Sequence, residues 1–189
     1  MTLAVTRAPD LAVLLQRDLA RYGLRSAKAS EVAPARALAA ALIGEAIVSA
    51  SDFARIQRVS NGAALFLAHE DEVLTGILAF MLLSDEGRRA IHAGAFDALS
   101  PRESHLAAPG ELARAFYGWG VAATTKDSAR RLIGGARDIM SGVLAHLPKF
   151  ARPTTEAGHR LMRERLGFVD LPQSGGLVWQ APRQERAAA

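Results

Sequence analysis

The pattern of apolar and polar positions between residues 116 and 147 predicts a buried strand followed by a long amphipathic helix. Residues 116–123 are aromatic or small and apolar and include two glycines, which suits a strand that another group approaches closely. From Ala129 to Leu147, apolar residues recur every three or four positions, which is one stripe of a helix. Thr124 and Asp127 have capping-box spacing at the joint. The sequence therefore predicts a helix whose N-terminus opens beside the end of a strand.

The start of this predicted helix is a candidate position for an anion. Backbone N–H groups in a first helical turn have no partners within the helix, so they attract negative groups such as phosphate. Lys126, Arg130 and Arg131 add positive charge to the same turn. A helix start that binds only water is the alternative interpretation.

Apolar periodicity and capping residues predict four helices and three strands before this unit, with a long irregular segment after them. The first predicted helix runs from Asp10 to Tyr22. The second starts between Glu31 and Ala35 and continues through Val48. The third runs from Asp52 to Val59 and is capped by Ser51. A first strand is expected at 24–29. Runs 63–68 and 73–83 around the polar turn 69–72 predict an antiparallel hairpin, with a buried helix as the alternative for the second run. A short helix follows at 84–93, and 94–111 is a long loop, a feature that is often functional in compact domains.

After Pro148 the pattern predicts a closing helix between short strands. The expected strands are 149–152, 169–171 and 176–181, and Thr154 or Thr155 caps the helix that ends at Gly167. Ala157, Leu161 and Leu166 are predicted to face inward. We predict one domain over residues 1–181, in which 1–22 form an N-terminal helical extension, and a disordered tail over 182–189.

Composition narrows the classes of function. The 189 residues are 50% hydrophobic and 22% charged, which is enough to build a core. The absence of cysteine excludes disulfides, thiolate metal sites and a cysteine nucleophile, and it suits the cytoplasm. No apolar run reaches the ~18 residues of a membrane span. The net charge is +4, but the arginines are scattered, which does not favour nucleic acid as a partner.

Other motifs carry weaker signals. The five histidines lack metal-ligand spacing, so no metal is expected. Gly118-x-Gly120-x-x-Ala123 matches a loose dinucleotide fingerprint, but the chain does not alternate regularly between strands and helices. No Gly-x-Ser-x-Gly elbow is present, which disfavours a serine hydrolase.

Four features, in this order, resemble the GCN5-related N-acetyltransferase (GNAT) superfamily. They are LRSAKASEVAPARALAAAL, the hairpin after the helical pair, the strand that runs into a helix at 121–124, and RPTTEAGHRLMRERLGF with its final Leu-Gly-Phe. Together they cover residues 23–181. The resemblance implies an α+β fold with a mixed, mostly antiparallel sheet, splayed near its middle and covered by helices on both faces.

The resemblance also implies an activity and a site. Members transfer an acetyl or other acyl group from acyl-coenzyme A to a primary amine, here a small molecule or a peptide, without a metal. By this resemblance the pantetheine arm pairs with the strand end, and the pyrophosphate lies on the next helix. The implied cofactor-binding residues are Trp119, Val121, Ala122 and Ala123, then Lys126, Asp127, Ser128, Ala129, Arg130 and Arg131. A homodimer is compatible with the sequence.

The candidate catalytic residues are less firmly marked. Glu111, just before the predicted strand, is the first candidate for the general base, and Tyr117 is a second candidate for proton transfer. The sequence departs from the superfamily at Ala129 and Arg131 in the phosphate loop. It also has Arg163 where a tyrosine acid is usual. A catalytically inactive GNAT-fold protein that binds acyl-coenzyme A or a protein partner is therefore the alternative function.

Overall fold

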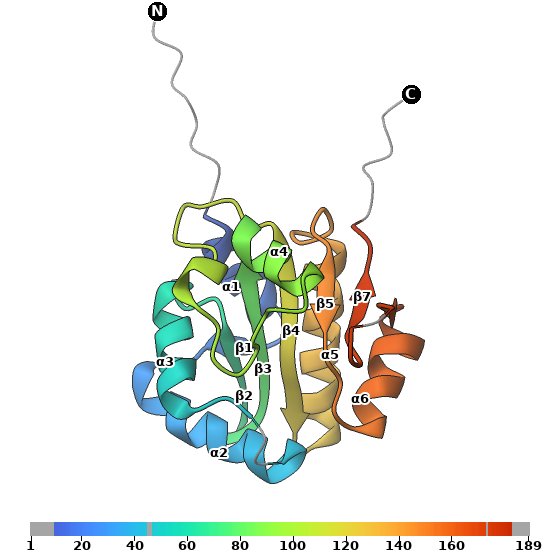
Figure 1. The fold of residues 1–189 in the computed structure, drawn as a ribbon. Helices are drawn as coiled ribbons and strands as arrows, with labels where there is room; N and C mark the ends of the chain where they lie inside the picture. The colour runs from blue at the N-terminus through green and yellow to red at the C-terminus, as the bar shows by residue number, and fades with distance from the viewer. Residues whose placement is uncertain (1–9, 45–46, 173, 183–189) are drawn as a thin grey trace, which may run out of the picture.

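A seven-stranded sheet forms the centre of the computed structural model, which describes residues 10–44, 47–172 and 174–182. The strand order is β1–β2–β3–β4–β5–β7–β6, and every neighbouring pair is antiparallel except β4 and β5. The strands are β1 (Leu24–Ser26), β2 (Leu65–Glu70), β3 (Val73–Leu83), β4 (Ala115–Ala123), β5 (Lys149–Ala151), β6 (Val169–Asp170) and β7 (Val178–Gln180). The mixed, mostly antiparallel sheet predicted from the sequence is thus confirmed (Figure 1).

Helices cover both faces of this sheet. The long ones are α1 (Leu11–Ala20), α2 (Val32–Ile43), α3 (Ala50–Val59), α4 (Asp85–His92) and α5 (Lys126–Ser141). The shorter ones are η1 (Ala29–Glu31), η2 (Glu103–His105), α6 (Glu156–Arg160) and a π-helical turn, η3 (Leu161–Arg165). Helices α1 and α5 pack on one face, and α2, α3 and α4 pack on the other (Figure 1). The sheet is therefore buried on both sides, which explains the continuous apolar run of β3.

Side-chain caps fix the helix starts, and two of them differ from the sequence prediction. Ser49, and not Ser51, caps α3 by accepting a hydrogen bond from the backbone N–H of Asp52. Thr125, and not Thr124, caps α5 through Ser128. In both cases two neighbouring residues can cap a helix. Backbone geometry, which the sequence pattern does not specify, selects one of them.

Two predicted helices are shorter than their apolar stripes. Helix α2 ends at Ile43 and does not reach Val48, because Gly44 turns the chain with a φ of 112°. Helix α5 ends at Ser141 and not near Leu147. In the closing helix Ala157 is exposed, so the prediction that it faces inward was wrong. Of the predicted tail at 182–189, all but Pro182 lies outside the described residues.

The hairpin and the glycine pair of α5 follow local rules. Asp71 and Glu72 have φ values of 47° and 64°, as a tight two-residue turn between antiparallel strands requires. This confirms strands, and not a buried helix, on both sides. Gly134 and Gly135 leave α5 continuous. A Cβ on Gly134 would lie 2.8 Å from the ring of Tyr22, so the pair allows close packing of α1 on α5.

Candidate functional site

The sheet opens in its middle, between the two parallel strands. β4 and β5 pair only over Phe116–Gly118 and Lys149–Ala151. Beyond Gly118, β4 continues to Ala123 alongside β3 alone. Among the residues that the structure describes, no strand therefore lies beside the β5-facing edge of residues 119–123. This is the splay expected from the sequence resemblance, and it lies at the residues expected to form it.

A β-bulge marks the same point of β4. Gly120 lies opposite Ala79 of β3 and Gly118 lies opposite Phe80, so Trp119 is an extra residue in the ladder. A bulge bends its strand and redirects the neighbouring backbone groups. Here Trp119 and Gly120, although adjacent in sequence, both line one cavity.

This cavity has a volume of about 290 Å³ and lies on the face that α2 and α3 cover. Its wall is mainly apolar and includes Ile43, Phe53 and Trp119. The rings of Phe53 and Trp119 pack with centroids 4.4 Å apart. The polar side chains among the described lining residues are Asp97, Tyr117, Arg152 and Thr154. We call this space the β4 cavity.

Tyr117 lies between the β4 cavity and a second cavity of about 300 Å³ under α4, and Arg152 lines both. The side chain of Tyr117 is almost fully buried. Burial raises the pKa of its phenol to about 12, and the positive charge of Arg152 opposes this rise. The phenol is therefore protonated at neutral pH and can donate a proton or a hydrogen bond.

The first turn of α5 is polar and already faces a carboxylate. Glu70, at the end of β2, accepts hydrogen bonds from the hydroxyls of Thr125 at 2.6 Å and Ser128 at 2.9 Å. These bonds hold the pKa of Glu70 below its usual range. Lys126 and Arg130 are exposed on the same turn. Asp127 is exposed as well, and Ala129 is half-buried.

Arg131 is not exposed beside Lys126 and Arg130 but points toward another element. Its guanidinium donates to the backbone carbonyls of Tyr22 at 2.8 Å, Gly23 at 2.6 Å and His69 at 3.2 Å. Two of these acceptors directly follow α1, so Arg131 ties the C-terminal end of α1 to α5. The structure gives it a contact role between elements.

The structure also separates Glu111 from the β4 cavity. Its carboxylate accepts a hydrogen bond from the backbone N–H of Ala108 at 3.0 Å in an exposed loop. It lines another cavity, of about 570 Å³, together with residues such as Leu82 and His146. This geometry does not favour Glu111 as a general base. Arg163, at the usual tyrosine position, forms an exposed ion pair with Asp170 at 2.6 Å.

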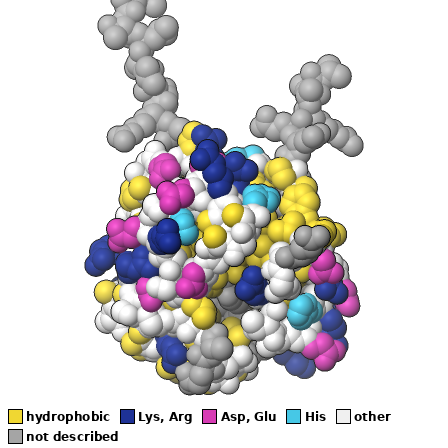
Figure 2. All heavy atoms as spheres, in the orientation of Figure 1, with side chains coloured by type: hydrophobic (Ala, Val, Ile, Leu, Met, Phe, Trp, Pro, Cys, Tyr) yellow, Lys and Arg dark blue, Asp and Glu magenta, His cyan; other side chains and the backbone are white. Residues whose placement is uncertain are grey.

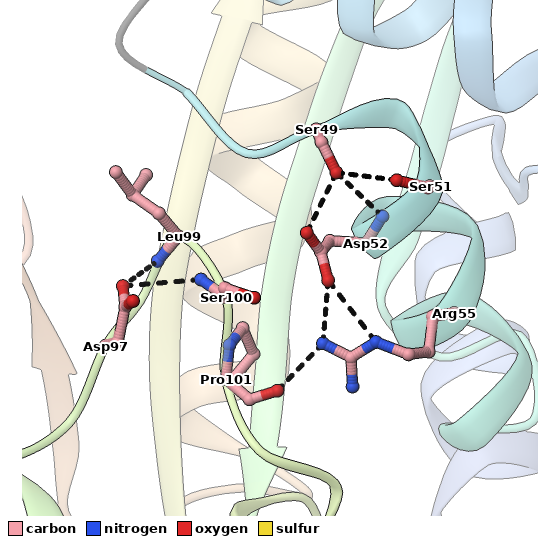
Figure 3. Close-up of polar contacts among 8 residues, drawn as sticks. All are labelled: Ser49, Ser51, Asp52, Arg55, Asp97, Leu99, Ser100 and Pro101. Carbon is pink, nitrogen blue, oxygen red and sulfur yellow. Dashed lines mark hydrogen bonds and ion pairs between the residues drawn. The ribbon is translucent and has the colours of Figure 1, made fainter.

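Asp97 is a candidate that the sequence analysis did not single out. It lies in the loop after α4 and lines the β4 cavity. One of its carboxylate oxygens accepts hydrogen bonds from the backbone N–H groups of Leu99 at 2.8 Å and Ser100 at 3.3 Å (Figure 3). An Asp that bonds to the backbone two or three residues on is a turn signal. That signal could have placed Asp97 in a fixed turn, but not beside β4.

Figure 2 shows Lys/Arg and Asp/Glu side chains interspersed on the viewed face. Within the described residues, no group of three or more His, Asp or Glu could hold a metal ion. In the same part of the chain, no helix combines the length and the apolar character that crossing a bilayer requires.

Comparison with known proteins identifies the architecture. No family model matches the chain, and no curated protein sequence matches it. A Staphylococcus aureus Mu50 protein, provisionally named an acetyltransferase, superposes with a TM-score of 0.50 and 14% identity, over 85% of this chain and 99% of that one. GphF, a GNAT-like decarboxylase in complex with isobutyryl-CoA, superposes with a TM-score of 0.48 and 12% identity, again over 85% of this chain and 99% of that one. With the first superposition and the splayed sheet together, the chain has a GNAT-like fold in a divergent sequence.

Proposed function

We propose that this protein transfers an acyl group, such as acetyl, from acyl-coenzyme A to a primary amine. The observation that carries the proposal is the coincidence of three features at one point of β4. These are the loss of the β5 partner after Gly118, the bulge at Trp119 and the apolar cavity beside it. An unpaired strand edge offers hydrogen bonds to an extended chain such as pantetheine.

In this proposal the strand edge and the helix start bind the co-substrate. The backbone of Trp119 and of Val121, Ala122 and Ala123 lies along the open edge. Lys126 and Arg130 supply positive charge at the α5 N-terminus, where Asp127, Ser128 and Ala129 contribute their backbone. The carboxylate of Glu70 opposes an anion there, so we expect weaker phosphate binding than an uncompensated helix start would give.

Two side chains of the β4 cavity then carry the proton transfers, Asp97 as the base and Tyr117 as the acid. A bound acyl thioester supplies an electrophilic carbonyl, to which an amine forms a C–N bond as the C–S bond breaks. A carboxylate oxygen of Asp97 accepts the proton that the ammonium loses before attack. Tyr117, protonated at neutral pH, donates its proton to the leaving thiolate, and its phenolate then takes the second proton that the nitrogen loses as the amide forms. Placing both groups at one cavity also orients the reactants.

The activity is tested by the release of free thiol from acetyl-coenzyme A in the presence of primary amines. Amine-dependent release supports the transferase. Binding of coenzyme A by calorimetry without any release supports the alternative, an inactive protein that binds acyl-coenzyme A on the same fold. The degenerate phosphate loop and Arg163 favour that alternative. A cytoplasmic location, a homodimer and a peptide acceptor stay predictions.

Tyr117→Phe tests the proposed acid. The substitution removes only the hydroxyl and keeps the buried ring, so we expect folding to persist and coenzyme A affinity to be unchanged. Loss of a general acid should lower kcat by about 10²-fold or more at neutral pH. If kcat is unchanged, Tyr117 only fills space. Tyr22→Phe, on the opposite face of the sheet, is the matched control.

A further inference from the structure

The β4 cavity offers a ligand an apolar interior and few charges. Its walls come from parts of the chain that are distant in sequence, namely α2, α3, β3, β4, the loop after α4 and the segment after β5. Ile43, Ile77 and Phe53 contribute apolar side chains, and Trp119 packs against Phe53. Among the described lining residues, Asp97 is the carboxylate and Arg152 is the cation. An acceptor with several positive charges would have to bury ammonium groups against hydrocarbon, which is costly.

The volume suits one bulky apolar group. An enclosed apolar cavity of about 150 Å³ holds a benzene molecule. About 290 Å³ therefore has room for an aromatic ring or a six-carbon chain with its attached amine. Because the cavity adjoins the bulge of β4, such an amine would lie next to the open strand edge.

The outer wall of the cavity is a loop that contacts α3. Phe96, Asp97, Ala98 and Leu99 line the cavity from this side. Arg55 of α3 donates to the backbone carbonyl of Pro101 at 2.8 Å, and the same nitrogen is 2.8 Å from the carboxylate of Asp52 (Figure 3). We call residues 94–101 the strap. Phe96 of the strap packs on Tyr117 of β4, with ring centroids 5.2 Å apart.

We propose that the β4 cavity binds the hydrocarbon part of the acceptor, and that the acceptor is a bulky apolar primary amine with Asp97 beside its ammonium group. That the bound amine reacts with acyl-coenzyme A rests on the proposed function. Its binding in the β4 cavity does not depend on that function. The acyl chain of the co-substrate is the other hydrocarbon that could enter. Asp97 favours the amine, because a carboxylate attracts an ammonium group and gives nothing to an acyl chain.

The test compares amines that differ only in hydrocarbon. Calorimetry on the full chain measures the Kd of propylamine, butylamine, pentylamine and hexylamine, and of hexane-1,6-diamine. Each methylene buried in the cavity should tighten binding about fourfold. The diamine has the length of hexylamine but a charged end, so it should bind at least about tenfold more weakly than hexylamine. Equal affinity for these two ligands, or no dependence on chain length, would overturn the proposal.

A variant locates the binding. Leu99 lies on the strap, lines the cavity and is 50% exposed, so Leu99→Asp adds a carboxylate without disturbing the core. We expect Leu99→Asp to weaken the binding of hexylamine and to tighten the binding of the diamine, so that the two Kd values come within about threefold of each other. Leu112→Asp is the control, since Leu112 is 69% exposed and lines a different cavity. If Leu112→Asp changes the ratio equally, binding is elsewhere.

The outcomes separate this inference from the proposed function. Chain-length-dependent binding of amines without any coenzyme A binding would retain the inference and remove the transferase. Coenzyme A binding with no discrimination among amines would retain the transferase and remove the inference about the acceptor. If affinity rises instead from acetyl- to hexanoyl-coenzyme A by about fourfold per methylene, the cavity holds the acyl chain and the proposal is wrong.

Discussion

Arg130 and Arg131 are adjacent in the sequence, but their side chains have different surroundings. Arg130 is exposed on the first turn of α5, whereas the three bonds of Arg131 to backbone carbonyls hold it against the end of α1. Since charged hydrogen bonds contribute more than neutral ones, Arg131 stabilises the contact of α1 with α5.

We predict that single substitutions separate these two roles. Arg130→Met should weaken coenzyme A binding about threefold or more, by an amount that shrinks as salt rises, with little effect on stability. Arg131→Met should lower the free energy of unfolding by about 1 kcal/mol, because partly buried carbonyls lose their charged donor, and leave the affinity unchanged. Urea unfolding and calorimetry measure the two quantities. A loss of affinity in Arg131→Met as large as in Arg130→Met would restore Arg131 to the phosphate site.

The sequence could not assign these roles. Both residues fall in the first helical turns, and both carry the same positive charge. Which way a long side chain turns depends on what lies beside the helix, here the carbonyls after α1. Tyr117 was a candidate from its place in an aromatic strand; the structure shows that it is buried, which raises its pKa to about 12, and its role in proton transfer stays a proposal. Glu111 was chosen for its position before the strand, and the fold carries it to another cavity.

The strap joins elements that the sequence treats as unrelated. Its contacts with α3 include a hydrogen bond between Ser100 and Asp52 and the bond of Arg55 to Pro101, and the side chain of Arg55 is 23% exposed, so solvent screens this link only in part. An opening of the strap would break the bond to Pro101 but leave α3 intact, because the cap of α3 is made by Ser49.

We predict that Arg55→Met opens the strap locally. Loss of the Pro101 contact should make cleavage of residues 94–101 by thermolysin about tenfold or more faster, since proteolysis follows the population of the open form. The global free energy of unfolding should change much less. Arg88→Met is the matched control, because Arg88 makes the same kind of i,i+3 ion pair with Asp85, also at 2.8 Å. Equal cleavage rates in both variants would show that the strap does not depend on Arg55.

At the scale of elements, the sequence succeeded where periodicity was long and caps were unambiguous. The hairpin, α1 and α4 were predicted because apolar stripes, caps and turn residues agreed. The strap appeared only as a long loop of functional interest. Its contact with α3 joins Arg55 to Pro101, 46 positions apart, and no local pattern encodes such a pairing. The helix ends at Ile43 and Ser141 were missed because apolar stripes continue past them.

For the whole molecule, the splay of the sheet was expected only through the resemblance. Apolar runs predict strands, but not which strands pair or where a pair separates. Parallel pairing of β4 with β5 over three residues is set by the short β5, which Lys149–Ala151 form before Arg152 leaves the sheet. The bulge at Trp119 likewise follows from the register with β3. Such long-range features depend on pairing between distant segments, so a single sequence underdetermines them.

Four carboxylates distributed over the molecule make its stability depend on acid. Glu31, Asp52, Glu70 and Asp85 all have pKa values below their usual range, mainly through hydrogen bonds from arginine or hydroxyl groups. The pKa of Glu31 falls furthest, from 4.5 to about 2, because Arg25 pairs with it at 2.5 Å. Each group binds its proton more weakly in the folded protein, so each stabilises the fold above its ordinary pKa and ceases to do so in acid.

We therefore predict that the free energy of unfolding in urea is nearly constant from pH 7 to 5 and then falls steadily toward pH 2. Protonation also raises the net charge above +4, and repulsion among 23 Lys and Arg side chains acts in the same direction. Glu31→Gln should lower stability at pH 7 and remove part of the fall between pH 4.5 and 2, so the two curves converge in acid. Curves that stay parallel down to pH 2 would mean that Glu31 gains nothing from Arg25, and a rise in stability on acidification would contradict the whole set of lowered pKa values.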